Sequence, residues 1–176
     1  MVMLMRFNIF LIFVCIFGYM GVKIVDCIKI DNKTQFDNNM KTCFFMSILF
    51  VIALTLFPVE IVSKNSVNYN LIPFKTILTF LSNKNIMDIC ANILGNIILF
   101  VPLGFFAYII FKGNKAKALS LCLAITISVE ILQLLLPARL CDVDDVITNF
   151  AGGYIGLILA FYFAKYINKN KLCQNK

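Results

Sequence analysis

Histidine is absent from this sequence, and charged residues are scarce. Without histidine, the protein lacks the commonest metal ligand and the commonest general base, so acid–base chemistry is left to carboxylates, lysine, tyrosine or cysteine. Only 14% of the residues are charged and 61% are hydrophobic, whereas a soluble domain has about 25% charged residues. The shortage of charge excludes an ordinary soluble domain and predicts an integral membrane protein.

Metal-binding cysteine motifs are missing as well. None of the seven cysteines forms a C-x-x-C pair, and most lie in apolar runs, where a free cysteine behaves as a small hydrophobic residue. We therefore predict no disulfide framework, no cofactor and no metal site. The formal net charge of +7 comes without a nucleic-acid motif, so we expect contact with the lipid bilayer and not with nucleic acid.

Long apolar runs are what the sequence has instead. A membrane-spanning helix needs roughly 20 predominantly apolar residues. Five segments meet this requirement: 1–22, 42–62, 89–111, 118–136 and 146–166. They predict an all-α fold, a polytopic membrane helical bundle with about five transmembrane helices. Residues 71–81 are apolar but too short to cross, and Pro73 bends them, so we expect an interfacial or re-entrant segment there.

The lysines and arginines predict an orientation. Five spans place eleven of the sixteen basic residues on one side and five on the other, and the richer side should be cytoplasmic. The N-terminus and the loop before the last span then face outward. The predicted domains are an extra N-terminal transmembrane anchor with a polar linker (1–41), a transmembrane domain (42–167) and a basic cytoplasmic tail (168–176).

Polar residues inside the spans share one predicted depth, the outer third of the bundle. They are Asn92, Asn96, Glu130, Gln133, Asp145 and Asn149. An ionisable residue within a span costs about 2.5–3.5 kcal/mol or more and usually faces the bundle interior with a partner. We therefore expect Glu130 to organise a site, while the amides are either ligands or interhelical hydrogen-bonding groups.

The stretch ILQLLLPARLCDVDDVITNFAGGYIG (131–156) places one arginine and three aspartates between two apolar runs. Arg139 is suited to an anionic group, and Asp142, Asp144 and Asp145 to a cation, an amine or the arginine itself. With Glu130, Asp142 and Asp145 are also the candidates for catalysis. Two simpler interpretations stay open: Asp142 and Asp145 cap the next helix, and Arg139 only pairs with a neighbouring aspartate.

Glycines and a proline predict close packing of the helices. Gly152 and Gly156 continue the face of the last span that carries the aspartates, and their G-x-x-x-G spacing lets another helix backbone approach closely. Gly95, Pro102 and Gly104 of the third span are expected to serve close packing and a kink.

Four segments, in this order, resemble the VanZ-like family of bacterial membrane proteins. They are NLIPF (70–74), NILGNIILFVPLGF (92–105), EILQ (130–133) and RLCDVDDVITNFAGGYIG (139–156), within a resemblance that covers about residues 42–166. The family's name-giving member is associated with low-level resistance to the glycopeptide teicoplanin. The resemblance thus implies a multi-pass protein of the bacterial cell membrane that lowers susceptibility to glycopeptides. The partner would be an envelope lipid, a cell-wall precursor or a glycopeptide, bound in the outward-facing polar pocket.

Two other functions stay open at this point. Glu130 and an aspartate have the chemistry for the acid and base of an intramembrane enzyme that acts on a lipid-linked envelope precursor. The same residues also suit the substrate site of a small transporter subunit. The sequence contains no evident nucleophile–base pair, which favours the non-enzymatic function.

The predicted orientation can be tested with reporter fusions. Alkaline phosphatase, which is active only outside the cytoplasm, should be inactive when fused after Lys176, because the side rich in basic residues stays inside. A reporter that works only in the cytoplasm should be active at the same position. The reverse pattern would place the aspartates on the cytoplasmic face.

Overall fold

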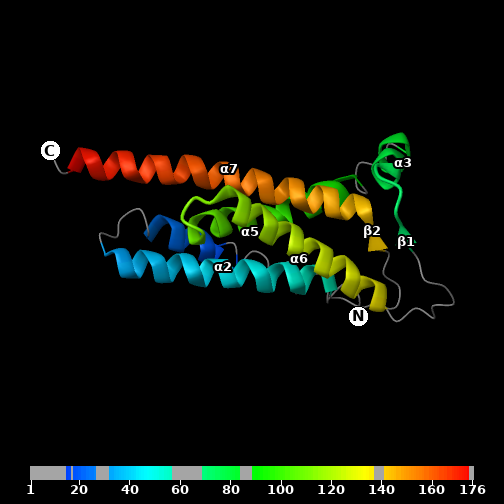
Figure 1. The fold of residues 1–176 in the computed structure, drawn as a ribbon, viewed down its shortest axis with the longest axis horizontal. Helices are drawn as coiled ribbons and strands as arrows, with labels where there is room; N and C mark the ends of the chain where they lie inside the picture. The colour runs from blue at the N-terminus through cyan, green and yellow to red at the C-terminus, as the bar shows by residue number, and fades with distance from the viewer. Residues whose placement is uncertain are drawn as a thin grey trace.

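The computed structural model describes residues 15–16, 18–26, 32–56, 69–83, 89–136 and 141–174. This part of the chain is an elongated bundle of helices (Figure 1), and the predicted all-α membrane bundle is confirmed. The first predicted span, 1–22, lies mostly outside the described residues.

Four of the described helices are long and apolar enough to cross a membrane. The candidate spans are Lys33–Thr55, Asn92–Ile110, Lys115–Leu135 and Val143–Ile167. They lie in α2 (Lys33–Leu56), in α5 (Gly95–Ile110) together with the helical residues just before it, in α6 (Lys115–Leu135) and in α7 (Val143–Gln174). Successive helices run in opposite directions along the bundle (Figure 1). The last turns of α2 and α6 therefore lie at the same end of the bundle as the first turns of α5 and α7.

Helix α2 begins earlier than the apolar run that predicts it. The side chain of Asn32 accepts hydrogen bonds from the backbone N–H groups of Thr34 and Gln35, at 3.0 and 3.4 Å. Asparagine is among the best residues for this capping position. Met40 then lies on the inner face and is buried. Residues that the sequence assigns to a polar linker are thus helical from Lys33 onward.

Apolar residues shared by three helices form the centre of the bundle. Phe50 and Val51 of α2, Phe100 and Leu103 of α5 and Cys122 of α6 pack together, and each exposes no more than 2% of its surface. The outer faces of the bundle are also apolar, and Leu135 remains 77% exposed. An exposed apolar surface of this extent is typical of contact with lipid.

The start of α5 departs from regular helical geometry. A π-helical turn, η1 (Ile89–Leu94), precedes Gly95 and contains Asn92, whose side chain is exposed. Further along, Pro102 is buried inside α5, where its missing N–H removes one backbone hydrogen bond. π-Helical turns are frequent at functional sites, and this one lies at the end of the bundle that carries the polar residues.

Glycines allow α5 and α7 to pack backbone against backbone. A Cβ added at Gly152 would overlap the carbonyl oxygen of Ile97, and Gly156 meets the backbone of α5 in the same way. From the other side, a Cβ at Gly104 would overlap the carbonyl of Gly153. No side chain fits in this seam, so the distance between the two helices depends on its glycines.

Two short strands and one short helix close an end of the bundle. Strand β1 (Tyr69–Asn70) pairs in parallel with β2 (Cys141–Asp142), and helix α3 (Lys75–Asn83) follows β1 beside the start of α7 (Figure 1). Phe74 and Leu78 expose more than half of their surfaces, 54% and 62%. The segment is too short to span a bilayer, and this apolar outer face fits the interfacial or re-entrant position, which stays a prediction.

Substitution of Gly152 by leucine tests the glycine seam. We expect Gly152→Leu to destabilise the bundle by about 3 kcal/mol, the upper part of the usual range for overpacking, because the obstacle is a backbone and not a movable side chain. Thermal unfolding in detergent measures the effect. Ala124→Leu, at an exposed position of α6, is the matched control and should unfold like the wild type. Equal stability of the two variants would contradict the close contact.

Candidate functional site

Polar side chains of α5, α6 and α7 meet where α6 ends and α5 and α7 begin. We call the following residues the polar cluster: Asn96, Glu130, Gln133, Asp142, Asp144, Asp145 and Asn149. All of them are buried or half-buried. Because a buried polar group is costly without a partner, their hydrogen bonds decide which of them are available to a ligand.

Asp144 is bound to the beginning of α3. One carboxylate oxygen accepts the backbone N–H of Phe74, and the other accepts those of Thr76 and Ile77, at 2.8 and 3.1 Å. The first N–H groups of a helix have no acceptor within the helix and favour negative charge. Asp144 therefore caps a helix 68 residues earlier in the chain, and both of its oxygens are occupied.

Asp142 joins β1, α3 and α7. One carboxylate oxygen accepts from the side-chain amide of Asn70 at 3.0 Å and from the backbone N–H of Asp144 at 2.9 Å. The other oxygen accepts from the hydroxyl of Thr76. The bond to Asp144 caps the first turn of α7, which is the simpler role that the sequence left open. The bonds to Asn70 and Thr76 are additional and hold α3 in place.

Phe74 explains why this anchoring is needed. It follows Pro73 and has a φ of 66°, a left-handed conformation that is rare for a bulky residue. The N–H of Lys75 donates to the carbonyl of Ile72 at 3.3 Å, so Pro73 and Phe74 occupy the centre of a turn in which glycine is usual at the second position. Such strain costs on the order of 1–3 kcal/mol, and the bond from Phe74 to Asp144 helps to offset it.

Glu130 points from α6 to the chain around β2. Its Oε2 accepts the backbone N–H of Asp142 at 2.9 Å, and the thiol of the preceding residue, Cys141, is close enough to be affected by its charge. Burial raises the pKa of the Cys141 thiol, and the negative charge of Glu130 raises it further. Both effects favour the protonated thiol over the thiolate.

Asp145 faces α5 instead of α3. Its Oδ1 accepts from the side-chain amide of Asn96 at 2.7 Å. This contact joins the start of α7 to the start of α5, directly beyond the glycine seam. Asp145 thus forms its hydrogen bond with α5, whereas Asp142 and Asp144 form theirs with β1 and α3. The carboxylate of Asp145 still lies close enough to the other two to be repelled by them.

Two amides of the polar cluster each retain a carbonyl oxygen without a hydrogen-bond donor. Asn149 donates to the hydroxyl of Thr126 at 3.0 Å, and Gln133 donates to the backbone carbonyl of Thr55 at 3.0 Å. Asn149 Oδ1 and Gln133 Oε1 are buried and have no hydrogen-bond partner among the residues that the structure describes. An unsatisfied buried acceptor of this kind costs about 1–3 kcal/mol, so both oxygens are available to a hydrogen-bond donor.

The predicted site residues are therefore not equivalent. Seven of them form the polar cluster, Asn92 lies apart on η1 with an exposed side chain, and Arg139 lies outside the described residues. Within the described part of the chain, no group of cysteine, aspartate or glutamate has the arrangement of a metal site. The capping bonds of Asp142 and Asp144 are structural, which leaves Glu130 and Asp145 as the carboxylates with fewer bonds.

Three threonines of the site were missed by the sequence reasoning. Thr55 and Thr76 belong to distant segments, and no local pattern connects them with the aspartates. Thr126 could have been predicted from the sequence. Thr126, Glu130 and Gln133 are spaced by four and three residues and therefore share one face of α6. All three are buried, so a polar stripe runs along the inner face of this helix.

Comparison with known proteins identifies relatives over most of this bundle. The family model described as VanZ/LLP1 matches residues 44–164. Protein VanZ of Enterococcus faecium is 34% identical over 83 residues, which are 46% of this chain and 51% of that protein. The chain thus spans about half the length of the curated relative that it matches. No solved structure matches the chain.

Asp144→Asn tests whether Asp144 holds α3. The substitution keeps the shape of the side chain but turns an amide N–H₂ toward backbone donors, so we expect a loss of about 1.5–3 kcal/mol in unfolding free energy, typical of hydrogen bonds to a charged group. Hydrogen exchange should accelerate at Thr76 and Ile77. Asp37→Asn, at an exposed position of α2, is the control. Unchanged protection of the two amides in Asp144→Asn would show that α3 is held by other contacts.

Proposed function

Because the chain belongs to the VanZ/LLP1 family, we propose that it is a multi-pass protein of the bacterial cell membrane that lowers susceptibility to teicoplanin-type glycopeptides. It does so through an outward-facing polar pocket built on the polar cluster. The function is binding: a component of the envelope, or the glycopeptide itself, is held at the outer surface of the membrane.

The observation that carries this proposal is an excess of acceptors over donors in the polar cluster. Glu130 and Asp145 are the carboxylates with fewer hydrogen bonds: Glu130 accepts the backbone N–H of Asp142, and Asp145 accepts the side-chain amide of Asn96. Two buried amide oxygens, on Gln133 and Asn149, have no donor within the described part of the chain. Buried negative charge needs a positive partner or several hydrogen-bond donors, so the cluster favours a ligand that supplies them.

The excess of hydrogen-bond acceptors in the polar cluster also indicates the chemistry of the ligand. A primary amine, with its positive charge and three N–H donors, suits two carboxylates and an amide oxygen. Amines and hydroxyls occur in envelope lipids, cell-wall precursors and glycopeptides alike. Arg139 stands two residues before Cys141 in the sequence, and in this proposal its guanidinium balances the carboxylates until the ligand replaces it.

The outward position of the cluster rests on the distribution of basic residues. Lys112, Lys115 and Lys117 follow α5 at the end of the bundle opposite to the cluster. Basic loops stay on the cytoplasmic side, so the cluster lies near the outer surface, where glycopeptides and exported precursors are encountered. α3, with its exposed apolar face, then covers the cluster at the level of the lipid headgroups.

The different surroundings of Glu130 and Asp145 also favour an enzymatic alternative. Glu130 accepts from the backbone N–H of Asp142, whereas Asp145 accepts from the side-chain amide of Asn96. Two carboxylates in unlike surroundings can divide the roles of acid and base. The substrate in that case is a lipid-linked envelope precursor, and the reaction takes place in the outer part of the membrane.

Carboxamide substitutions test the proposed function and separate the two alternatives. We expect expression of the chain in a glycopeptide-susceptible bacterium to raise the minimum inhibitory concentration of teicoplanin. Glu130→Gln and Asp145→Asn should each remove part of the increase, and the double variant should remove all of it, because each carboxylate contributes separately to binding. Asp37→Asn on the exposed face of α2 should keep the full increase at the same amount of membrane protein.

Two other outcomes would contradict the binding function. Complete loss in each single variant, with the membrane protein present at the normal level, would favour acid–base chemistry over binding. If the wild-type chain leaves the inhibitory concentration unchanged while it accumulates in the membrane, the proposed role in glycopeptide susceptibility is wrong.

A further inference from the structure

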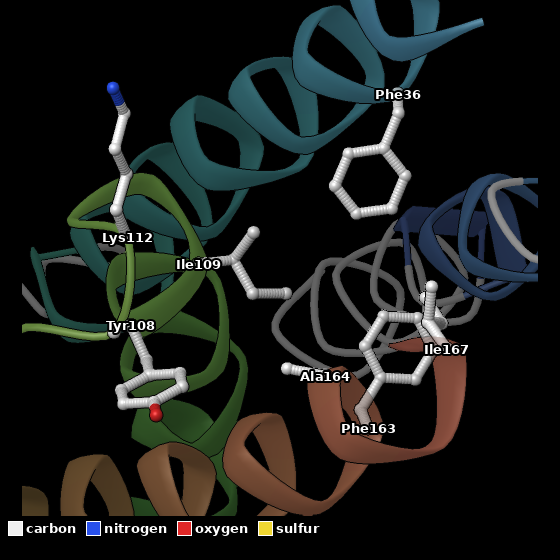
Figure 2. Close-up of a pocket in the computed structure, with 8 residues that line it drawn as sticks. Phe36, Tyr108, Ile109, Lys112, Phe163, Ala164 and Ile167 are labelled. Atoms are coloured by element: carbon white, nitrogen blue, oxygen red, sulfur yellow. The ribbon is translucent and has the colours of Figure 1, made fainter. Parts of the chain in front are cut away.

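A cavity of about 330 Å³ lies at the end of the bundle opposite to the polar cluster. Its walls come from the first turns of α2, the last turn of α5 and the second half of α7 (Figure 2). The described lining residues are Phe36, Tyr108, Ile109, Lys112, Gly113, Phe163, Ala164 and Ile167. Its volume is at the lower end of the range of about 300–1,000 Å³ found for small-molecule sites.

The walls of the cavity are apolar, and its rim is polar. Figure 2 shows Phe36, Phe163, Ile109 and Ile167 around the open space. These side chains are half-buried, whereas Lys112 and Gly113 are exposed, so the cavity opens at the surface of the bundle. No acidic residue occurs among the described lining residues. The cavity is therefore suited to an apolar chain that carries a negative charge at one end.

The turn between α5 and α6 fixes the lysine at the rim. Lys112 and Gly113 have φ values of 52° and 84°, and the N–H of Gly113 donates to the carbonyl of Tyr108 at 2.9 Å. In Figure 2 the stem of Lys112 starts at the cavity and its ammonium extends beyond it. The hydroxyl of Tyr108 lies beside Gly113, since a Cβ there would come within 3.4 Å of it.

The neighbouring lysines are placed differently. The ammonium of Lys115 lies 5.4 Å from the centre of the Phe161 ring and makes a cation–π contact on the outside of α7. Lys117 is exposed on the first turns of α6 and does not line the cavity. Lys112 is thus the lysine of this turn that combines a positive charge with access to the apolar walls.

We propose that this cavity binds an anionic phospholipid, with part of one acyl chain between Phe36, Ile109 and Phe163 and the phosphate at Lys112. The membrane that surrounds the bundle supplies such a lipid at high local concentration. A lysine near an anionic bilayer contributes about 1 kcal/mol to lipid attraction. The site does not depend on the function proposed for the polar cluster.

Lipid binding to purified variants tests the proposal. Phosphatidylglycerol and phosphatidylcholine with the same acyl chains are added to the full-length protein in detergent, and native mass spectrometry and thermal shifts report binding. We expect phosphatidylglycerol to bind and stabilise the wild type more than phosphatidylcholine does. Lys112→Gln should weaken phosphatidylglycerol binding roughly fivefold, whereas Lys117→Gln, which removes the same charge from the same region, should leave it unchanged.

A cavity-filling variant tests the apolar half of the site. Ala164→Phe should abolish lipid retention without lowering stability in the absence of lipid, and Ile109→Phe serves the same purpose if the first variant does not fold. Three results would overturn the proposal. They are equal weakening by Lys112→Gln and Lys117→Gln, equal binding of the two lipids, and a dimer in detergent that the cavity-filling variant dissociates, which would assign the cavity to a second copy of the chain.

Discussion

The carboxylate of Asp144 is the contact on which the polar end of this bundle depends. It accepts three backbone N–H groups at the start of α3, where the helix itself offers no acceptor. In an apolar environment those groups would otherwise remain unsatisfied at a cost of several kcal/mol. The same contact keeps β1 beside β2, so Asp142 reaches Asn70 and its own N–H reaches Glu130. Asp144 thus helps to position the polar groups of β1, β2 and the end of α6.

The glycine seam places the second half of the polar cluster. Because Gly152 brings the backbones of α5 and α7 together, Asn96 can reach Asp145 with a short amide side chain. A wider spacing of the helices would require a longer side chain or a water molecule for this contact. Helix packing therefore controls the geometry of the site. The glycines of the seam set the spacing of α5 and α7, and this spacing decides which polar side chains meet beyond the seam.

The two ends of the bundle differ in chemistry. Carboxylates and amide oxygens gather where α7 begins, and lysines gather in the turn between α5 and α6. Between them the core contains apolar residues such as Phe100 and Leu103, which are fully buried. An acidic end suits donors and cations, and a basic end with apolar walls suits anionic lipid. The separation follows from the bilayer, which tolerates charge only near its surfaces or where the charge has a partner.

The sequence by itself determined the helical class, the approximate positions of the described spans and the end of the bundle at which most of the polar residues meet. These properties follow from the length of apolar runs and from the 3.6-residue period of the helix, which are local. It did not determine which aspartates bind α3, the early start of α2, or the hydrogen bonds of Thr55 and Thr76. Asp144 and Thr76 are 68 residues apart, and their contact is between a side chain and a backbone N–H, a group that every residue except proline carries. Such a bond leaves no pattern in the sequence, so only the tertiary structure could decide that two of the aspartates hold α3 while Glu130 and Asp145 keep fewer bonds.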